Sequence, residues 1–348
     1  MLEDIVAPLL AWYEENKRVL PWREDRNPYH IWLSEIMLQQ TRVEAVKGYY
    51  ERFLDRLPEV RDLAAVPEDA LMKLWQGLGY YNRARNLKRA AVMIMDDYGG
   101  VFPEEYEEIL RLPGIGTYTA GAVASMAFGK AVPAVDGNVY RVYTRLVRES
   151  GDITQGKVQK GIREEISKIM PLDAPGEFNQ AWMDLGAGVC IPVGEPLCEK
   201  CPLAEQCQAR MAGDASLYPN KPKKKPRKRE EKTVFILEYQ GKYVLQKRPD
   251  QGLLAGLWEF PSQEGHLSPE EAGTLLREWG AWGDEVELLG PGKHIFTHIE
   301  WHMLGYLVHL KELPQRGAEN LVLASREEIR RDFSIPSAYG VYLERLMS

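Results

Sequence analysis

The 348-residue sequence predicts a mainly α N-terminal part followed by an α+β C-terminal domain. Up to about residue 212, apolar residues recur every three or four positions, as they do in amphipathic helices. From Thr233 onward, short runs of β-branched and aromatic residues replace that spacing and indicate strands. A hydrophobic content of 45% over this length is enough to form two domains.

The expected helices of the N-terminal part are separated by short breaks that contain Pro or Gly. One helical face is formed by Val43, Val46, Tyr50, Phe53, Leu54 and Leu57. Breaks are expected at Leu57-Pro58, Gly99-Gly100 and Met170-Pro171. No apolar run approaches the roughly 18 residues of a membrane span, and the acidic start of the chain is unlike a secretion signal. We therefore expect a cytoplasmic protein that has no membrane partner.

The stretch RLPGIGTYTAGAV, residues 111–123, interrupts a helical pattern with Pro113, Gly114 and Gly116. A helix, a Gly-rich turn and a second helix leave backbone N–H groups at the turn without an internal partner. Phosphate oxygens are natural acceptors there, because glycine does not shield the backbone and the helix dipole favours an anion. We therefore predict a helix-hairpin-helix element over about 108–125 that holds a nucleic-acid backbone through Gly114 and Gly116. An ordinary Pro-Gly loop is the alternative.

The net charge of −7 is unevenly distributed along the chain. Residues 1–229 contain 32 acidic and 32 basic side chains, whereas residues 230–348 contain 19 acidic and 12 basic side chains. No acid lies between Asp69 and Asp96 or between Glu108 and Asp136. These stretches suit a phosphate backbone, although a basic helix face is more often simply solvated.

Two carboxylates are candidates for chemistry. Asp136 is the first acid after a long acid-free stretch, and an isolated carboxylate beside a phosphate-binding turn is suited to stabilising positive charge on a sugar. Its alternative role is to cap the helix NVYRVYTRLV. Glu35 lies among apolar residues in IWLSEIMLQQ, where burial would raise its pKa and make it a general acid near neutral pH. An exposed helical glutamate is the alternative.

The four cysteines, Cys190, Cys198, Cys201 and Cys207, fall within 18 residues. Disulfides are not expected in a cytoplasmic chain, so this grouping predicts a metal site. Both a zinc ion and an iron–sulfur cluster take four cysteines, and the spacing alone does not decide between them.

A basic, extended linker over 213–231, which contains NKPKKKPRKREEK, is expected to join a domain at 1–212 to a domain at 232–348. Strands are expected in TVFILEY and YVLQKR, which flank Gln240-Gly241-Lys242. A second strand-rich region is expected in HIFTHIEWHMLGYLVHL, residues 294–310.

Six segments follow one another along nearly the whole chain: LPWR…PYHIWLSEIMLQQTRV, GLGYYNRARNL, LPGIGTYTAGAV, VDGNVYRV, FNQAWMDLGAGVC and the cysteine cluster. In this combination they resemble the MutY-type adenine DNA glycosylases of the helix-hairpin-helix superfamily. Several segments are shared with endonuclease III relatives, but LSEIMLQQT together with DGNV is specific to the adenine enzymes. The resemblance implies a helix-hairpin-helix glycosylase fold with a four-cysteine iron–sulfur module, followed by a Nudix-like domain.

The resemblance implies hydrolysis of the N-glycosidic bond of adenine mispaired with 8-oxoguanine or guanine in double-stranded DNA, after the adenine is flipped into a pocket. The resemblance further implies that Glu35 protonates the adenine at N7 and that Asp136 stabilises the oxocarbenium-like sugar directly or through a covalent adduct. Tyr118 and Asn138 resemble the residues that order this site in the family, and Trp22 and Arg23 resemble those that line the adenine pocket. The implied contacts with the lesion pair are Gln40, Thr41, Leu78 and Tyr80. For Gln40 and Leu78, packing is the alternative role.

Tyr118 stands where endonuclease III relatives carry a lysine, whose amine forms a Schiff base that leads to strand cleavage. A phenol cannot form a Schiff base. We therefore predict a monofunctional glycosylase that leaves an intact abasic strand.

The C-terminal region resembles a Nudix-like domain that reads 8-oxoguanine with a Phe-Ser-His turn, and this chain has Phe296-Thr297-His298. The methyl group of Thr297 crowds that contact and stiffens the rotamer, which puts the strength of the preference for 8-oxoguanine in doubt. Arg277-Glu278 is not followed by the Glu pair that holds a divalent metal in a Nudix hydrolase. We therefore expect recognition without hydrolysis.

The resemblance also favours a [4Fe–4S] cluster at the four cysteines. The usual spacing is six, two and five residues between successive cysteines, whereas seven residues separate Cys190 from Cys198 here. Gly194 and Pro196 are expected to absorb the extra residue in a wider turn. We expect the protein to act as a monomer.

Three other functions remain open from the sequence. They are a glycosylase of the same fold that removes thymine opposite guanine, a silent DNA-binding or redox-sensing protein, and a nucleotide-pool Nudix hydrolase. The retained Glu35 and Asp136 argue against the silent protein. The incomplete Nudix box argues against the hydrolase.

Overall fold

The structure, a computed structural model, describes residues 2–222, 226–314 and 320–347. Its contacts divide the chain into two compact units, each made of two segments. The first unit comprises Met1–Ala65 and Arg85–Lys223, and the second comprises Val66–Ala84 and Lys224–Ser348. No helix in the described part of the chain is both long and apolar enough to cross a bilayer.

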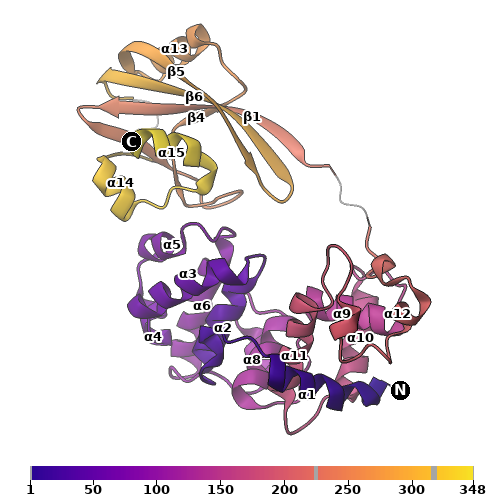
Figure 1. Cartoon of the computed structure of the whole chain (residues 1–348). Coiled ribbons are helices and arrows are strands. Elements are labelled where there is room, and N and C mark those ends of the chain that lie inside the picture. The colour runs from indigo at the N-terminus through magenta and orange to yellow at the C-terminus, as the bar shows by residue number, and fades with distance from the viewer. Residues whose placement is uncertain (1, 223–225, 315–319, 348) are drawn as a thin grey trace. The chain divides into compact units, whose positions relative to one another are not determined.

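The first unit is helical (Figure 1). Its helices are α1 (Val6–Asn16), α2 (Pro28–Leu38), α3 (Val43–Arg56), α4 (Val60–Ala65), α6 (Asn82–Asp97), α7 (Tyr106–Arg111), α8 (Thr117–Phe128), α9 (Gly137–Val147), α10 (Gly156–Lys168), α11 (Pro175–Gly188) and α12 (Gln208–Ala212), of which α6 begins in the second unit. The predicted apolar face of residues 43–57 lies on α3, where Val46, Tyr50 and Phe53 are buried. A core around Phe178 and Trp182 of α11 joins α1, α9, α10 and α11.

The interruption at Pro113–Gly116 is a turn between two helices. The short helix α7 ends at Arg111, and α8 starts at Thr117 with Gly116 as its N-cap residue. Gly114 has a φ of +77°, which is in the left-handed region that side chains rarely adopt. Both glycines are exposed at the turn. Two helices joined by a tight turn lie over about 108–125, as the predicted helix-hairpin-helix element requires, and its contact with a nucleic-acid backbone stays a prediction.

Gly114→Ala is expected to destabilise the first unit by about 2 kcal/mol or more, because alanine is strained in the left-handed backbone and has no room. A Cβ atom there would lie 2.5 Å from Cβ of Asn86. Thermal unfolding should show a decrease in Tm of about 4–8 °C. Gly116→Ser is the matched control, since Gly116 has a φ of −99° and nothing within 4 Å of an added Cβ. Equal losses of Tm in the two variants would contradict this explanation.

The second unit is built on a mixed seven-stranded sheet with the main order β3-β2-β1-β6-β5. Strand β1 runs parallel to β6, and the other pairings are antiparallel. The strands are β1 (Lys228–Tyr239), β2 (Lys242–Lys247), β3 (Trp258–Glu259), β4 (Ser262–Glu264), β5 (Trp282–Ile295), β6 (Ile299–Glu312) and β7 (Leu321–Ala324). The helices are α5 (Glu68–Trp75), α13 (Pro269–Glu278), α14 (Arg326–Asp332) and α15 (Gly340–Met347).

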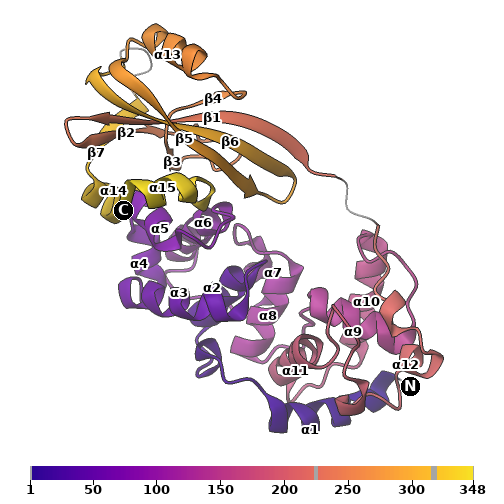
Figure 2. The same ribbon diagram turned by 45° about the horizontal axis from the view of Figure 1, so that its top comes forward.

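The central strand β1 is apolar on both faces because each face has its own core. Val234 and Ile236 pack with Tyr339 and Tyr342, on the side of α14 and α15. Phe235 and Leu237 contribute to a second cluster with Ala272 and Leu276 of α13. Figure 2 shows α13 on one side of the sheet and α15 on the other. The continuous run TVFILEY is therefore a strand covered on both faces.

Two predicted boundaries differ from the structure. Strand β1 begins at Lys228, so the end of the linker expected over 213–231 is paired backbone, in which Lys228–Glu231 lie opposite Ile299–His302 of β6. These residues are polar, and backbone pairing does not need apolar side chains, so their composition concealed the strand. The central linker residues 223–225 lie outside the described residues.

The second difference concerns α5, which the sequence places in the domain at 1–212 but which belongs to the second unit. The Lys73 ammonium donates to the carbonyl oxygen of Phe333 at 2.9 Å, and Gln76 Nε2 donates to that of Ile335 at 2.8 Å. Such contacts join residues more than 250 positions apart, and no local sequence pattern indicates them.

Candidate active site

One pocket of the first unit brings most of the predicted catalytic and pocket residues together. It has a volume of about 590 Å³, which is within the usual range for a small-molecule site. The predicted residues that line it are Trp22, Arg23, Glu35, Gln40, Thr41, Gly116, Tyr118, Asp136 and Asn138. They come from five separate parts of the chain, so the fold and not the sequence spacing assembles them.

Glu35 is a buried carboxyl group in the wall of this pocket. It lies on α2, is only 5% exposed, and accepts a hydrogen bond from the Tyr118 hydroxyl at 2.5 Å. Burial raises the pKa of Glu35 to about 7, and the negative charge of Asp136 acts in the same direction. The hydrogen bond from Tyr118 and the charge of Arg23 act in the opposite direction. The alternative of an exposed helical glutamate is therefore wrong, and Glu35 can hold a proton near neutral pH.

Asp136 lies in the same pocket and is also the N-cap residue of α9. Its Oδ1 accepts hydrogen bonds from the backbone N–H groups of Asn138 and Val139, each at 2.8 Å. Its Oδ2 accepts one from Nδ2 of Asn138 at 2.7 Å. Burial raises the pKa of Asp136, whereas these three hydrogen bonds and the helix dipole favour its charged form. Capping and a charge-stabilising role are thus compatible at this position.

Asn138 is held in place from two sides. Its Oδ1 accepts a hydrogen bond from Arg141 Nη2 at 2.9 Å, and Arg141 also donates to the carbonyl oxygens of Gly186 and Cys190, each at 2.7 Å. Gly186 of α11 leaves room for it, since an added Cβ there would lie 2.6 Å from Cβ of Asn138. The side chain is therefore fixed while it donates to Asp136.

Tyr118 links α8 to α2 through its hydrogen bond to the Glu35 carboxyl group. Burial raises the pKa of Tyr118 well above its ordinary value, and the negative charges of Glu35 and Asp136 add to that effect. The phenol therefore stays protonated and acts as a hydrogen-bond donor. None of the described residues that line this pocket is a lysine.

Two of the predicted DNA-contact residues adopt left-handed backbone conformations, which are uncommon for residues other than glycine. Gln40 follows α2 with a φ of +58°, and Tyr80 follows α5 with a φ of +48°. Both are exposed, Tyr80 to 47%. Strained, exposed turns of this kind are often functional. Leu78 is buried, which favours its alternative role in packing.

The turn that carries Tyr80 is built by its own unit. The indole Nε1 of Trp75 donates to the carbonyl oxygen of Gly79 at 3.1 Å. Arg83 donates to the carbonyl oxygens of Leu78 and Gly79 at 3.0 and 3.1 Å. The Arg83 guanidinium also lies over the rings of Trp75 and Tyr80. These contacts hold the backbone in the left-handed conformation.

The predicted lesion-reading residues Phe296, Thr297 and His298 form the connection between β5 and β6 in the second unit. The side chains of Thr297 and His298 are exposed. Phe296 is anchored by edge-on ring contacts with His294 and Trp301. Within this unit, the Thr297 and Tyr80 hydroxyl oxygens lie 2.6 Å apart, within hydrogen-bonding distance. Tyr80, predicted to contact the lesion pair, and Thr297, predicted to read the lesion, are therefore adjacent.

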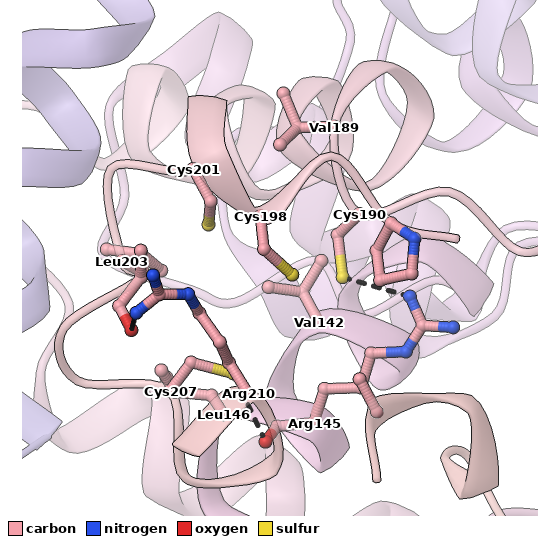
Figure 3. A pocket seen from close by; sticks show the side chains of 13 residues that line it. Val142, Arg145, Leu146, Val189, Cys190, Cys198, Cys201, Leu203, Cys207 and Arg210 are labelled. Atoms are coloured by element: carbon pink, nitrogen blue, oxygen red, sulfur yellow. Dashed lines mark hydrogen bonds between the residues drawn. The ribbon is translucent and has the colours of Figure 1, made fainter. Parts of the chain in front are cut away.

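The four cysteines surround a second pocket of the first unit (Figure 3). The rest of its lining is mostly apolar, with Val142, Leu146, Val189 and Leu203 among its members, and also includes Arg145 and Arg210. Arg145 Nη1 donates to Sγ of Cys190 at 3.2 Å. Four thiols, an apolar surround and a nearby guanidinium suit a group that binds cysteine thiolates.

The seven-residue loop between Cys190 and Cys198 is closed by a hydrogen bond from the Leu197 N–H to the Val189 carbonyl at 2.9 Å. Gly194 in its middle has a φ of +80°, as a wider turn requires. The longer spacing therefore does not prevent Cys190 and Cys198 from facing the same pocket.

The chain matches two family models. Residues 33–168 match the HhH-GPD superfamily base excision DNA repair protein, and residues 233–345 match the NUDIX domain. The adenine DNA glycosylase of Mus musculus is 35% identical, in an alignment covering 89% of this chain and 71% of the mouse protein. That of Buchnera aphidicola subsp. Acyrthosiphon pisum is 35% identical, over 90% of this chain and 88% of the relative. The chain belongs to the adenine DNA glycosylase family.

Two solved structures are similar to the helical part of this family member. A thermostable thymine-DNA glycosylase is 32% identical with a TM-score of 0.56, over 60% of this chain and 96% of that one. An endonuclease III in a non-covalent DNA complex is 26% identical with a TM-score of 0.52, over 61% of this chain and 98% of that one. The predicted fold class, a helical glycosylase domain with a Nudix domain, is confirmed.

Three residues in or beside the candidate pocket were not singled out from the sequence. Arg18 and Gln180 line the pocket, and Asp184 is buried behind Arg18 and Arg23. Gln180 and Asp184 lie within FNQAWMDLGAGVC, which carries part of the family resemblance. Their place in that segment was the only local indication of a role in the site. The type of a polar residue on a helix does not indicate which distant residue it will contact.

Proposed function

We propose that this chain removes adenine mispaired with 8-oxoguanine or guanine from double-stranded DNA and leaves an abasic site. The observation that carries the proposal is the pairing of Glu35 and Asp136 in one pocket with different surroundings. Glu35 is buried with one hydrogen-bond donor, whereas Asp136 accepts three hydrogen bonds at the start of a helix. Two carboxyl groups with separated environments divide the roles of acid and charged stabiliser.

The proposed reaction starts with the flipped adenine in the pocket. Protonated Glu35 gives its proton to N7, so the bond between C1′ and N9 breaks and its electron pair leaves with the base. The carboxylate of Asp136 stabilises the positive charge that develops on the sugar. Water then adds to C1′ and loses its proton to one of the two carboxylates. The base and an abasic sugar are the products.

The same site supports the proposal that the enzyme does not cut the strand. A Schiff base needs an amine, and Tyr118 supplies a phenol instead. The Tyr118 hydroxyl is engaged by Glu35, so it is suited to orienting the acid.

The exposed turn of Thr297 and its neighbour Tyr80 support recognition of the base opposite the adenine. The Tyr80 ring can stack on a base, and the Tyr80 and Thr297 hydroxyl groups can hydrogen-bond to an oxidised purine. The Nudix domain is proposed to recognise this base without hydrolysing nucleotides. Arg277, which belongs to the incomplete Nudix box, donates a hydrogen bond to the Thr274 hydroxyl of its own helix α13 at 2.9 Å.

We further propose that Cys190, Cys198, Cys201 and Cys207 hold a [4Fe–4S] cluster. In the described part of the chain, no three His, Cys, Asp or Glu side chains are grouped so that they could hold one metal ion. Four thiols spread around one pocket would therefore hold a multi-iron cluster better than a single zinc ion. When bound, the cluster supplies a rigid anchor for the loop between Cys190 and Cys207. Purified protein should be brown and contain iron and sulfide; stoichiometric zinc without iron would contradict this proposal.

The substrate is tested with end-labelled duplexes that carry adenine opposite 8-oxoguanine, guanine or thymine, and one that carries thymine opposite guanine. We expect base release from the first two and none from the adenine–thymine pair. Release of thymine without release of adenine would overturn the proposal and favour the activity named for the similar thymine-DNA glycosylase. Equal rates opposite 8-oxoguanine and guanine would show that Thr297 does not support lesion preference.

A further inference from the structure

The proposed reaction does not use one buried carboxylate that lies directly behind the pocket. Asp184 lies on α11 and is 3% exposed. Its Oδ1 accepts hydrogen bonds from Nε of Arg18 at 2.7 Å and from Nη2 of Arg23 at 3.0 Å. Its Oδ2 accepts one from Nη1 of Arg23 at 2.8 Å and one from the backbone N–H of Arg18 at 3.2 Å. A single side chain therefore fixes two guanidinium groups.

Both arginines form part of the wall of the pocket that contains Glu35 and Asp136. The Arg23 side chain is 14% exposed and that of Arg18 is 37% exposed. Although burial opposes it, the hydrogen bonds from Arg23 and then Arg18 hold the pKa of Asp184 below its ordinary value. Asp184 is therefore ionised at neutral pH and cancels one of the two positive charges.

That cancellation affects the proposed acid. The groups that face Glu35 from the surrounding elements are Tyr118 of α8, Asp136 at the start of α9, and Arg23 of the single turn Pro21–Arg23. A positive charge near a carboxyl group favours its ionised form and works against a general acid. Arg23 without its partner would favour loss of the Glu35 proton more strongly.

We propose that Asp184 is a positioning residue of the adenine pocket: it holds Arg18 and Arg23 in the pocket wall and limits their positive charge beside Glu35. This inference rests on the proposed function. It assigns Asp184 a part in keeping the acid protonated at neutral pH, through Arg23 and without contact with the adenine.

The test measures single-turnover adenine release between pH 5.5 and 9 at saturating enzyme. Asp184→Asn keeps the shape of the side chain but removes its charge. The pH above which the rate falls should move down by about half a unit to one unit, so that the rate at pH 8 falls by about three- to tenfold. Arg18→Met removes one positive charge and should move that pH up. The double variant should return it close to the wild-type position.

Glu177→Gln is the matched control. It removes one carboxylate from the same helix, where Glu177 forms an exposed pair with Arg26 outside the pocket. Its pH profile should match the wild type. A purely structural ion pair would lower the rate of Asp184→Asn equally at every pH, and that result would overturn the inference. If Asp184→Asn does not fold, Arg18→Met decides: an upward shift supports the inference, and an unchanged or lowered pH overturns it.

Failure of the inference about Asp184 can be distinguished from failure of the proposed function. If the wild-type protein releases no adenine from any duplex, the proposed function fails. If the wild type is active and the two charge variants leave the profile in place, only the role of Asp184 fails.

Discussion

Asp136→Asn is expected to lower the single-turnover rate of adenine release on the order of 10²–10³-fold, while duplex binding and Tm stay close to the wild type. Asparagine caps a helix as well as aspartate does, so its oxygen can still accept from the N–H groups of Asn138 and Val139. It carries no charge, and the positive sugar loses its stabilising partner. Rates are measured with excess enzyme over an end-labelled duplex, and binding is measured by gel shift or fluorescence anisotropy.

Asp136→Ala is the matched control, because it removes both the cap and the charge. It should be as inactive as the Asn variant and should also lose about 1 kcal/mol of stability, or about 2–4 °C in Tm. An Asn variant that keeps more than a tenth of the wild-type rate would show that Asp136 is only a cap. An Asn variant that is as unstable as the Ala variant would make the loss of rate uninformative and contradict the separation of the two roles.

Glu35→Gln is expected to lower the rate of adenine release by about 10²- to 10⁴-fold, the usual contribution of a general acid. The pH profile gives a sharper readout. The pKa of Glu35 is raised to about 7, so the protonated form prevails below pH 7 and the wild-type rate is constant there. Above pH 7 the rate should fall about tenfold per pH unit. The Gln variant has no proton to lose and should show no such decrease.

Tyr118→Phe distinguishes the acid from the residue that donates to it. The hydrogen bond from Tyr118 lowers the pKa of Glu35, so its removal should move the decrease in rate to higher pH while the decrease itself remains. A decrease that persists in Glu35→Gln would assign the titrating group to another residue.

Several of the residues that line the pocket were predictable from short segments. The setting of Glu35 among apolar residues and of Asp136 after a long acid-free stretch makes both residues candidates, but their roles as acid and charged partner come from the resemblance of the surrounding segments to adenine glycosylases. The sequence left capping and catalysis as alternatives for Asp136. The structure makes the two roles compatible, because the start of α9 lines the pocket and its N–H groups donate to the Asp136 carboxylate.

The long-range contacts were not predictable. Asp184 meets Arg18 and Arg23 across more than 160 positions, and α5 contacts the end of the chain across more than 250. Periodicity shows which face of a helix is apolar, but it does not show which distant face will cover it. The polar start of β1 was hidden for a related reason, since its pairing with β6 depends on backbone groups that every residue has.

The proposed site, formed by Glu35, Asp136 and Tyr118, should release adenine and leave the strand intact. This expectation is tested most directly with a duplex that carries adenine opposite 8-oxoguanine and is labelled on the adenine strand, divided after reaction into samples with and without hot alkali. We expect full-length strand without alkali and cleavage at the adenine position with alkali. We also expect that borohydride traps no protein–DNA adduct at a rate comparable to that of base release. Strand cleavage without alkali at the rate of base release, together with a borohydride-trapped adduct at stoichiometric yield, would contradict it.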